Sequence, residues 1–559
     1  PNRIIIRNIK NIKIHFITQS SNFYRKLLKN QIAASHKKYL ADIETDLRND
    51  PKKLWSYVQS KKGLTRIPGR MIYNDNSLNT PSDIVDAFAS YFQSSYTQSS
   101  DNNSNIDDTY NLNTPTFYIK EITEHDILTA INYLNNSFTA GPDELPSFFV
   151  RDCKYVFIQP LLAIFNTALK NGVFPSKWKL SKVIPVFKSG DKADVSKYRP
   201  ICILCNFSKV LEIILYSYIY PHVRNFISPQ QHGFIDKRST VTNLACISQF
   251  IAEEIDNQSQ VDVIYTDFSK AFDRIDHKIL TSKIEAFGIT GLVLHLLKSY
   301  ISHRSQYVFY NGFSSFTYQI HSGVPQGANL GPLLFIMFIN DLPTISKCPL
   351  LLYADDAKLY NVINDFKDAQ LLQDDLNRLN FWCSSNKLHL NVNKCKVVSF
   401  TRKTSPTIYD YKFGNDPLIR ESVIKDLGIF FDCKLTFVYH INHIIAKAFS
   451  LLGFIIRQGK SFNNISTIKV LFNSYVVACL QYGCIIWHPI YFIHISAIEA
   501  VQRRFLKFCW FKKHGIYPQR GIDNSILLAE FEMLSLDSRR QIAIITFFHK
   551  IVQFKIDCA

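Results

Sequence analysis

The stretch from Leu350 to Tyr360 constrains the fold more than any other part of the chain. Three leucines, a tyrosine and an alanine precede Asp355 and Asp356, and a short alternating segment follows them. This pattern predicts a hairpin that carries two adjacent carboxylates on its turn. Neighbouring carboxylates repel each other unless a cation lies between them, and oxygen ligands suit Mg²⁺ better than zinc. Asp355 and Asp356 are therefore predicted metal ligands, although an isolated Asp pair is more often a solvated turn.

A second predicted strand also ends on an acid. Residues 261–266 are largely apolar, and Asp267 follows them, just before a predicted helix that begins at Ser269 and continues through Phe287. A carboxylate at the end of a buried strand is costly unless a cation is near. If the hairpin lies beside this strand in one sheet, the three acids converge, and two Mg²⁺ about 3.5–4 Å apart could bind there.

The composition favours a nucleic-acid partner, with an acidic membrane surface as the second choice. Lys and Arg total 64 against 46 Asp and Glu, a net charge of +18, and 43 Phe and 28 Tyr supply stacking surfaces. Twelve scattered cysteines predict reduced thiols in an intracellular protein. Residues 470–493 are uncharged and long enough to span a membrane, but Pro489 and several polar residues interrupt them, so a buried helix and no membrane partner are predicted.

Five regions are predicted along the chain. Residues 1–93 form a basic helical region, whose first part either binds nucleic acid or presents a solvated helical face. Residues 94–116, rich in Ser, Asn and Asp, form a polar linker. A helical extension at 117–180, a central region at 181–440 and a helical C-terminal region at 441–559 follow. Local signals predict a helix capped by Thr123, a helix ending before Gly172 and a buried helix starting near Pro332.

Basic and glycine-rich segments lie between the predicted acids. Arg199 either pairs with a phosphate or belongs to a surface loop. Lys237 and Arg238 precede a helix opened by Ser239 or Thr240, and their charge suits a triphosphate or template backbone as well as an ordinary helix start. The glycines of segment 322–332 allow close backbone approach to a base pair, and its glutamine can hydrogen-bond a nucleotide without reading the base.

The ordered set of these motifs resembles the reverse transcriptases of non-LTR, LINE-type retrotransposons, and it is most similar to their jockey-like branch. The motifs are Tyr198 to Ile201, Gly233-Phe234, Asp267 to Phe272, Gly323 to Gly327, and Tyr353 to Asp356. The resemblance implies an α+β, right-hand polymerase fold, with an antiparallel palm sheet flanked by helices. Fingers are expected before Asp267, fingers and palm together over 181–440, and a helical thumb after about residue 440.

The same resemblance implies roles for individual residues. Asp267, Asp355 and Asp356 would be catalytic ligands of two Mg²⁺, for which Mn²⁺ could substitute. Phe272 would exclude a 2′-hydroxyl, and Gln326 and Gly327 would contact the nucleotide. The expected phosphate contacts are Arg199 and Lys209 toward the nucleotide, and Lys237, Arg238 and Lys394 toward the template or phosphate. Ala328, where these enzymes usually have Ser, and the 235–237 run depart from the family pattern.

The implied activity is RNA-directed DNA synthesis by two-metal nucleotidyl transfer, extending a DNA 3′ end on an RNA template. The implied partners are an RNA template, a DNA primer or nicked target DNA, and deoxynucleoside triphosphates, with action in the nucleus. The sequence begins at Pro1 and its first Met is Met71, so it is expected to be a fragment or a processed piece. Such relatives usually carry an upstream endonuclease, which residues 1–116 do not supply. A group II intron maturase or telomerase-like enzyme would share the acids. A decayed or repurposed RNA-binding protein is the alternative from another class.

Overall fold

The computed structural model describes residues 2–47, 49–62, 67–97, 112 and 114–558. The chain divides into two compact units, each described by itself below. The first unit contains residues 1–66 and 437–547, and the second contains residues 67–436 and 548–559. Most of the predicted polar linker at 94–116 lies outside the described residues.

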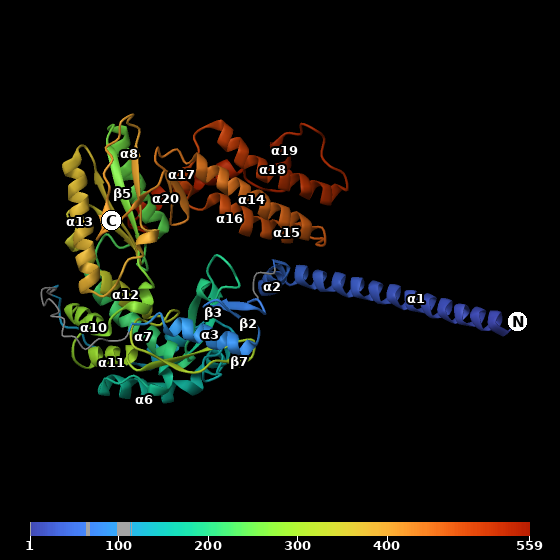
Figure 1. The fold of residues 1–559 in the computed structure, drawn as a ribbon, viewed down its shortest axis with the longest axis horizontal. Helices are drawn as coiled ribbons and strands as arrows, with labels where there is room; N and C mark the ends of the chain where they lie inside the picture. Colours follow the sequence, from blue (N-terminus) through green and yellow to red (C-terminus); the bar gives the residue numbers. More distant parts are fainter. Residues whose placement is uncertain (1, 48, 63–66, 98–111, 113, 559) are drawn as a thin grey trace. The chain divides into compact units, whose positions relative to one another are not determined.

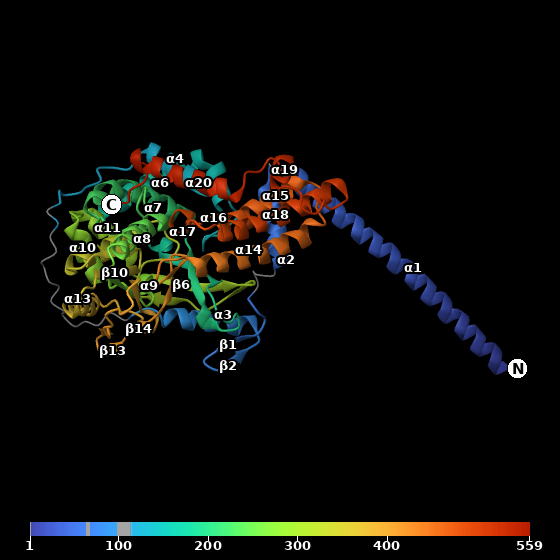
Figure 2. The same cartoon turned by 90° about the horizontal axis from the view of Figure 1, so that it is seen from above.

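The first unit is helical among its described residues, as predicted for the C-terminal region. Its elements are α1 (Asn2–Thr45), α2 (Pro51–Lys62), α14 (Val438–Gly459), α15 (Ile465–Phe472), α16 (Ala478–Gln481), α17 (Cys484–Trp487), α18 (Phe492–His514), α19 (Asn524–Glu530) and most of α20 (Leu536–Val552). Helices α14 and α18 pack side by side (Figures 1 and 2). Of the helices in the described part of the chain, α14 is the one long and apolar enough to cross a membrane, by length and composition. Its buried residues, Ile441, Ile444, Ala448, Leu452 and Ile455, recur at helical spacing, as they do on a helix packed in a core.

The single buried helix predicted over 470–493 is not continuous. Helix α15 ends at Phe472, a π-helical turn follows over Asn473–Val477, and α16 ends at Gln481. Gly483 then takes a left-handed conformation, with φ of 59°, before α17 begins. A left-handed residue cannot continue a right-handed helix, so the apolar stretch divides at Gly483 into the helical run that ends at Gln481 and the short helix α17.

The second unit is built around a five-stranded central sheet. Its strands, in spatial order, are β14 (Ile419–Arg420), β11 (Lys396–Thr401), β5 (Gln260–Asp267), β10 (Asp356–Val362) and β9 (Leu350–Tyr353). All neighbours are antiparallel except β11 and β14, so the predicted antiparallel sheet is present with one parallel pair at its edge. Helices α8 (Thr240–Asp256) and α13 (Phe366–Ser385) pack against it, with β5 and β10 between them (Figures 1 and 2).

A second sheet combines strands from both sides of Asp267 in the sequence. It contains β4 (Tyr198–Ile203), β3 (Leu180–Phe187), β6 (Arg304–Tyr310), β7 (Phe313–Ser314) and β8 (Tyr318–Ile320). Strand β3 pairs in parallel with β6, so a sheet that starts before Asp267 in the sequence is completed by strands that follow it. Helix α3 (Pro81–Gln93) supplies Phe88 and Phe92 to the core of this sheet.

Most predicted helix ends are confirmed. Thr123 caps α4 (Glu124–Tyr133) in a capping box, α6 (Lys154–Asn171) ends before Gly172, and Ser239 caps α8. Helix α12 (Gly331–Ile339) begins one residue before Pro332, close to the predicted start, and it is almost wholly buried. Further helices and strands of this unit are α5 (Ser147–Asp152), α7 (Asn206–Val223), α11 (Gly291–Ile301), β12 (Lys412–Phe413), β13 (Asp416–Pro417), β15 (Val423–Asp426) and β16 (Ile429–Asp432).

Two stretches that were predicted as helical have a different structure. The helix expected from Ser269 to Phe287 divides into α9 (Ala271–Arg274) and α10 (His277–Ala286). Asp276 causes this break, because its carboxylate accepts hydrogen bonds from the first backbone N–H groups of α10. Within the region predicted as basic and helical, β1 (Met71–Tyr73) and β2 (Asn76–Leu78) form a hairpin.

Candidate active site

The backbone brings the predicted acids to one end of the central sheet. Asp356 opens β10 and is the direct antiparallel partner of Asp267, the last residue of β5. The β9–β10 hairpin turns through Ala354 and Asp355, and Ala354 adopts φ of 55°. The predicted hairpin and its place beside β5 are thus confirmed, and Asp355 lies on the turn next to the paired acids.

The two acids of the hairpin ionise reluctantly. Burial raises the pKa of Asp356 to about 6, and the neighbouring Asp355 carboxylate adds to that effect. Burial also raises the pKa of Asp355, and the charge of Asp267 contributes, while Arg199 and Lys188 oppose the shift. Carboxylates crowded in this way attract a cation, since a positive charge between them removes the repulsion.

Lys394 lies directly on the third acid. Its ammonium nitrogen, Nζ, is 2.7 Å from Oδ2 of Asp267. The lysine side chain is 52% exposed, so this ion pair adds little to stability. Lys394 was predicted as a template or phosphate contact, and the structure places it at the acids.

Two more cations border the same acids. Partial desolvation lowers the pKa of Lys188, the charges of Lys394 and Arg199 lower it further, and Asp267 and Asp355 oppose the change. No role was predicted for Lys188 from the sequence. Lys209 is not brought to this group, because its charged neighbours are Glu212 and Asp143.

The predicted nucleotide contact Gln326 has a protein partner. Its Nε2 donates a 2.8 Å hydrogen bond to Oδ1 of Asp273, a buried carboxylate. Burial raises the pKa of Asp273 to about 6, and the bond from Gln326 partly offsets that rise. The loop also packs on this backbone through Gly323, where an added Cβ would lie 2.6 Å from the carbonyl oxygens of Phe272 and Asp273.

Gly327 joins the loop to the second sheet. It adopts φ of 108°, and an added Cβ would lie 2.8 Å from the carbonyl oxygen of Cys202 on β4. The Cys202 backbone N–H donates to the carbonyl of Gln326, at 2.8 Å. Phe272 is half-buried and stacks on Phe335, with ring centroids 4.6 Å apart.

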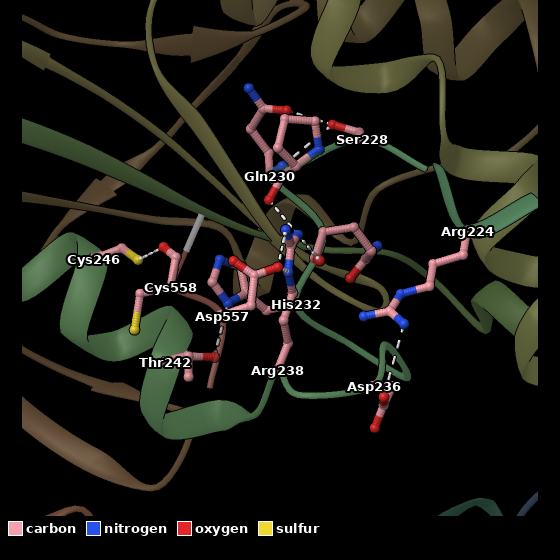
Figure 3. A network of polar contacts seen from close by, with 12 residues as sticks. Arg224, Ser228, Gln230, His232, Asp236, Arg238, Thr242, Cys246, Asp557 and Cys558 are labelled. Carbon is pink, nitrogen blue, oxygen red and sulfur yellow. Dashed lines mark hydrogen bonds and ion pairs between the residues drawn. The ribbon is translucent and has the colours of Figure 1, made fainter. Parts of the chain in front are cut away.

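Arg238 has intramolecular partners where a template contact was predicted. Its guanidinium donates to Oδ2 of Asp557 at 2.9 and 2.7 Å, and to the Gln231 carbonyl at 2.8 Å (Figure 3). It also donates to the Pro229 carbonyl. This set of bonds engages the side chain within the protein, which argues against a phosphate contact. Lys237 is exposed, and its carbonyl accepts a hydrogen bond from the Asp557 backbone.

The acids suit a hard divalent cation by chemistry and by register. Carboxylate oxygens are the ligands that Mg²⁺ prefers, and Asp267 and Asp356 are strand partners beside Asp355. Within the described ranges, however, no three His, Cys, Asp or Glu side chains are arranged as a metal-binding group. The donor types fit the ion, while the side-chain positions place the Lys394 ammonium, not a third carboxylate, against Asp267.

Several supporting residues had no role in the sequence-based prediction. Gln231 accepts hydrogen bonds from the backbone N–H groups of Gly233 and Ala354. Lys358 of β10 forms a buried ion pair with Asp426 of β15, 2.6 Å from Nζ to Oδ2. These contacts join residues far apart in the sequence, so no local pattern pointed to them.

Comparisons with known proteins agree with the geometry. Residues 188–456 match the family described as reverse transcriptase (RNA-dependent DNA polymerase). The chain is 28% identical to the RNA-directed DNA polymerase from mobile element jockey of Drosophila melanogaster over 408 residues, 70% of this chain and 44% of the relative. From the same organism, the probable RNA-directed DNA polymerase from transposon BS is 28% identical, with 70% and 44% covered, and that from transposon X-element is 28% identical, with 66% and 42% covered. The chain thus spans less than half the length of these relatives.

Proposed function

We propose, from the match of residues 188–456 to the reverse transcriptase family and from the similarity to the jockey polymerase, that this chain is an RNA-directed DNA polymerase of a non-LTR retrotransposon. It extends a DNA 3′ end along an RNA template, using deoxynucleoside triphosphates. The single observation that carries the proposal is the pairing of Asp267 with Asp356 beside Asp355 at the end of the central sheet.

The three carboxylates would hold two Mg²⁺, or Mn²⁺ in their place. When bound, these ions would lower the pKa of the primer 3′-hydroxyl and neutralise the departing pyrophosphate. The protein supplies the rigid placement, because the acids come from paired strands and a two-residue turn.

The cations beside the acids are suited to the triphosphate. Lys188 and Arg199 act electrostatically on Asp355, and Lys394 lies 2.7 Å from Asp267. A triphosphate brings several negative charges to the acids, which makes such cations necessary for binding. Lys188, Arg199 and Lys394 are therefore assigned to the triphosphate and pyrophosphate, whereas Lys209 and Arg238 are not.

Phe272 is assigned to the sugar of the incoming nucleotide. Its ring is held by stacking on Phe335 at 4.6 Å and by an edge contact with Phe234 at 6.4 Å. A ring held in place on two sides can exclude a 2′-hydroxyl, because it cannot turn aside. Phe272→Val should therefore increase incorporation of ribonucleotides relative to deoxynucleotides.

The right-hand architecture belongs to the same proposal. The central sheet is assigned as the palm and the β4-β3-β6-β7 sheet as part of the fingers. The Gln326 loop is bonded to the second sheet, because the Cys202 N–H on β4 donates to the Gln326 carbonyl. The helical first unit supplies the thumb. Action on genomic DNA in the nucleus follows from the proposed target.

The test is primer extension on an RNA template with Mg²⁺, comparing the wild type with Asp355→Asn. Asp410→Asn is the matched control, because Asp410 is an exposed carboxylate of the same unit. Activity lost only in Asp355→Asn supports the polymerase and its acids together. Activity that survives the substitution makes the assignment of Asp355 wrong. Folded wild-type protein that binds RNA without extending the primer favours the alternative, a repurposed RNA-binding protein.

A further inference from the structure

Gln231 makes an unusual pair of contacts beneath the acid-bearing turn. Its Oε1 accepts the backbone N–H of Ala354 at 2.9 Å and that of Gly233 at 2.7 Å. Ala354 directly precedes Asp355 and holds φ of 55°, a conformation that a non-glycine residue adopts only when its surroundings fix it. One buried oxygen therefore fixes both the turn and the segment under it.

The backbone of this segment touches the same turn. A Cβ added at Gly233 would lie 2.3 Å from the Ala354 nitrogen, so only glycine permits the observed approach. On one side, His232 N–H donates to the Leu352 carbonyl, and Leu352 N–H donates to the Gln230 carbonyl, both at 2.9 Å. The segment thus forms a seat for the hairpin through backbone bonds as well as through the Gln231 side chain.

Stability alone does not explain a glutamine here. Gln231 is 1% exposed, and its Nε2 has no hydrogen-bond partner among the described residues. A buried N–H group without a hydrogen-bond partner lowers the stability of the folded chain. Gln231 therefore leaves one buried N–H group without a partner while its oxygen makes two hydrogen bonds at the turn. This combination is typical of a residue whose role is to position a neighbouring segment.

The seat is fixed in turn by a segment distant in the sequence. Arg238 donates to the Gln231 carbonyl and to the Asp557 carboxylate, which holds it in place (Figure 3). The Asp557 N–H donates to the Lys237 carbonyl. The Cys246 thiol of α8 donates to the Cys558 carbonyl at 2.7 Å. Residues 557–558 therefore brace the segment that carries Gln231.

We infer that Gln231 is a positioning residue for the catalytic turn, holding Ala354 so that Asp355 and Asp356 keep their places at the end of the sheet. Gln231 does not contact the reacting atoms in this assignment. Its effect on catalysis rests on the proposed polymerase function, whereas its effect on the turn does not.

The test compares Gln231→Met with Gln231→Glu. Met has a similar length but no acceptor, whereas Glu keeps an oxygen for both N–H groups. Hydrogen exchange at the Ala354 amide, followed in a peptide spanning the turn, should become at least about tenfold faster in Q231M and stay near wild type in Q231E. In primer extension, kcat of Q231M should fall by about 10- to 100-fold with KM for the nucleotide nearly unchanged, and Q231E should recover part of the loss.

The control is Gln230→Met, because the adjacent Gln230 contacts the hairpin through its backbone only. Unchanged exchange at Ala354 in Q231M overturns the inference, and so does faster exchange with an unchanged kcat. If Q231M does not fold, Gln231→Asn, which keeps the amide on a shorter side chain, replaces it with the same expectations. If the wild type extends no primer, the polymerase proposal fails, and the exchange measurement alone decides whether Gln231 holds the turn.

Discussion

Asp267 and Asp356 are direct partners across β5 and β10, and Asp355 occupies the turn beside them. Like charges placed this closely destabilise the folded chain unless a cation is bound. Strand pairing therefore holds together acids that would otherwise repel each other, which is typical of a site built for metal chemistry.

Asp356→Asn should abolish primer extension without destabilising the protein. The substitution removes one repelling carboxylate but keeps the shape of the side chain. We expect activity to fall by more than about 100-fold, because a metal ligand contributes several kcal/mol to the transition state. In EDTA, thermal unfolding should occur at the same or a higher temperature than in the wild type. A marked loss of thermal stability would contradict this account, and Asp410→Asn should change neither quantity.

The acids could be found from the sequence because their signals are local. An apolar run ending on Asp267 and a hairpin ending on Asp355 and Asp356 each lie within a few residues, and sheet pairing then brings them together. Helix ends at Thr123 and Gly172 were predicted for the same reason. The break at Asp276 was missed, because the helical spacing of apolar residues continues across it. The hydrogen bonds by which Asp276 caps α10 nevertheless start a new helix there.

The supporting contacts could not be predicted, because they join distant segments. Gln231 and Ala354 are 123 positions apart, and Arg238 and Asp557 are 319 apart. Arg238 was predicted as a phosphate contact because the sequence around a basic residue at a helix start does not show which group that residue binds. An intramolecular carboxylate and an external phosphate attract a guanidinium in the same way.

Gly233→Ala should impair the enzyme by displacing the turn. The new Cβ would lie 2.3 Å from the backbone nitrogen of Ala354, which cannot move without moving Asp355. We expect a loss of about 1–3 kcal/mol in the free energy of unfolding, as in other overpacked sites. Primer extension should fall by about 100-fold, since small displacements of catalytic groups are costly. Gly69→Ala is the control, because nothing lies within 4 Å of its added Cβ. Equal behaviour of the two variants in denaturant and in primer extension would refute the close contact.

Gln326→Met should produce a stability deficit that depends on pH. The native pKa of Asp273 is about 6, above its ordinary 3.8, so ionised Asp273 costs stability above pH 6 and this cost disappears as the pH falls toward 4. Without the Gln326 bond the pKa should rise further and the cost at high pH should grow. We therefore expect a deficit of about 1–3 kcal/mol near pH 8 that shrinks as the pH falls toward 6, because below pH 6 Asp273 is protonated in both proteins. Urea unfolding of Gln326→Met and of the wild type at pH 8 and at pH 5 measures this deficit.

The matched control for that experiment is Gln319→Met, since Gln319 is exposed on β8 of the same unit. It should leave the free energy of unfolding nearly unchanged at either pH. A deficit of Gln326→Met that stays constant from pH 8 to 5 would show that the Asp273 bond is not its cause.

Lys358 and Asp426 should show strong energetic coupling. Their charged atoms are 2.6 Å apart, their side chains are only 2% and 4% exposed, and Nζ of Lys358 also donates to Oδ1 of Asn243 at 2.6 Å. Lys358→Met or Asp426→Leu alone leaves a buried charge without its partner, which should cost about 3–5 kcal/mol in urea unfolding. The double variant should recover most of that loss, because two apolar side chains need no compensation. The exposed pair Arg402 and Asp256 should instead contribute less than about 1 kcal/mol. Additive losses in the double variant would mean that the two charges do not depend on each other.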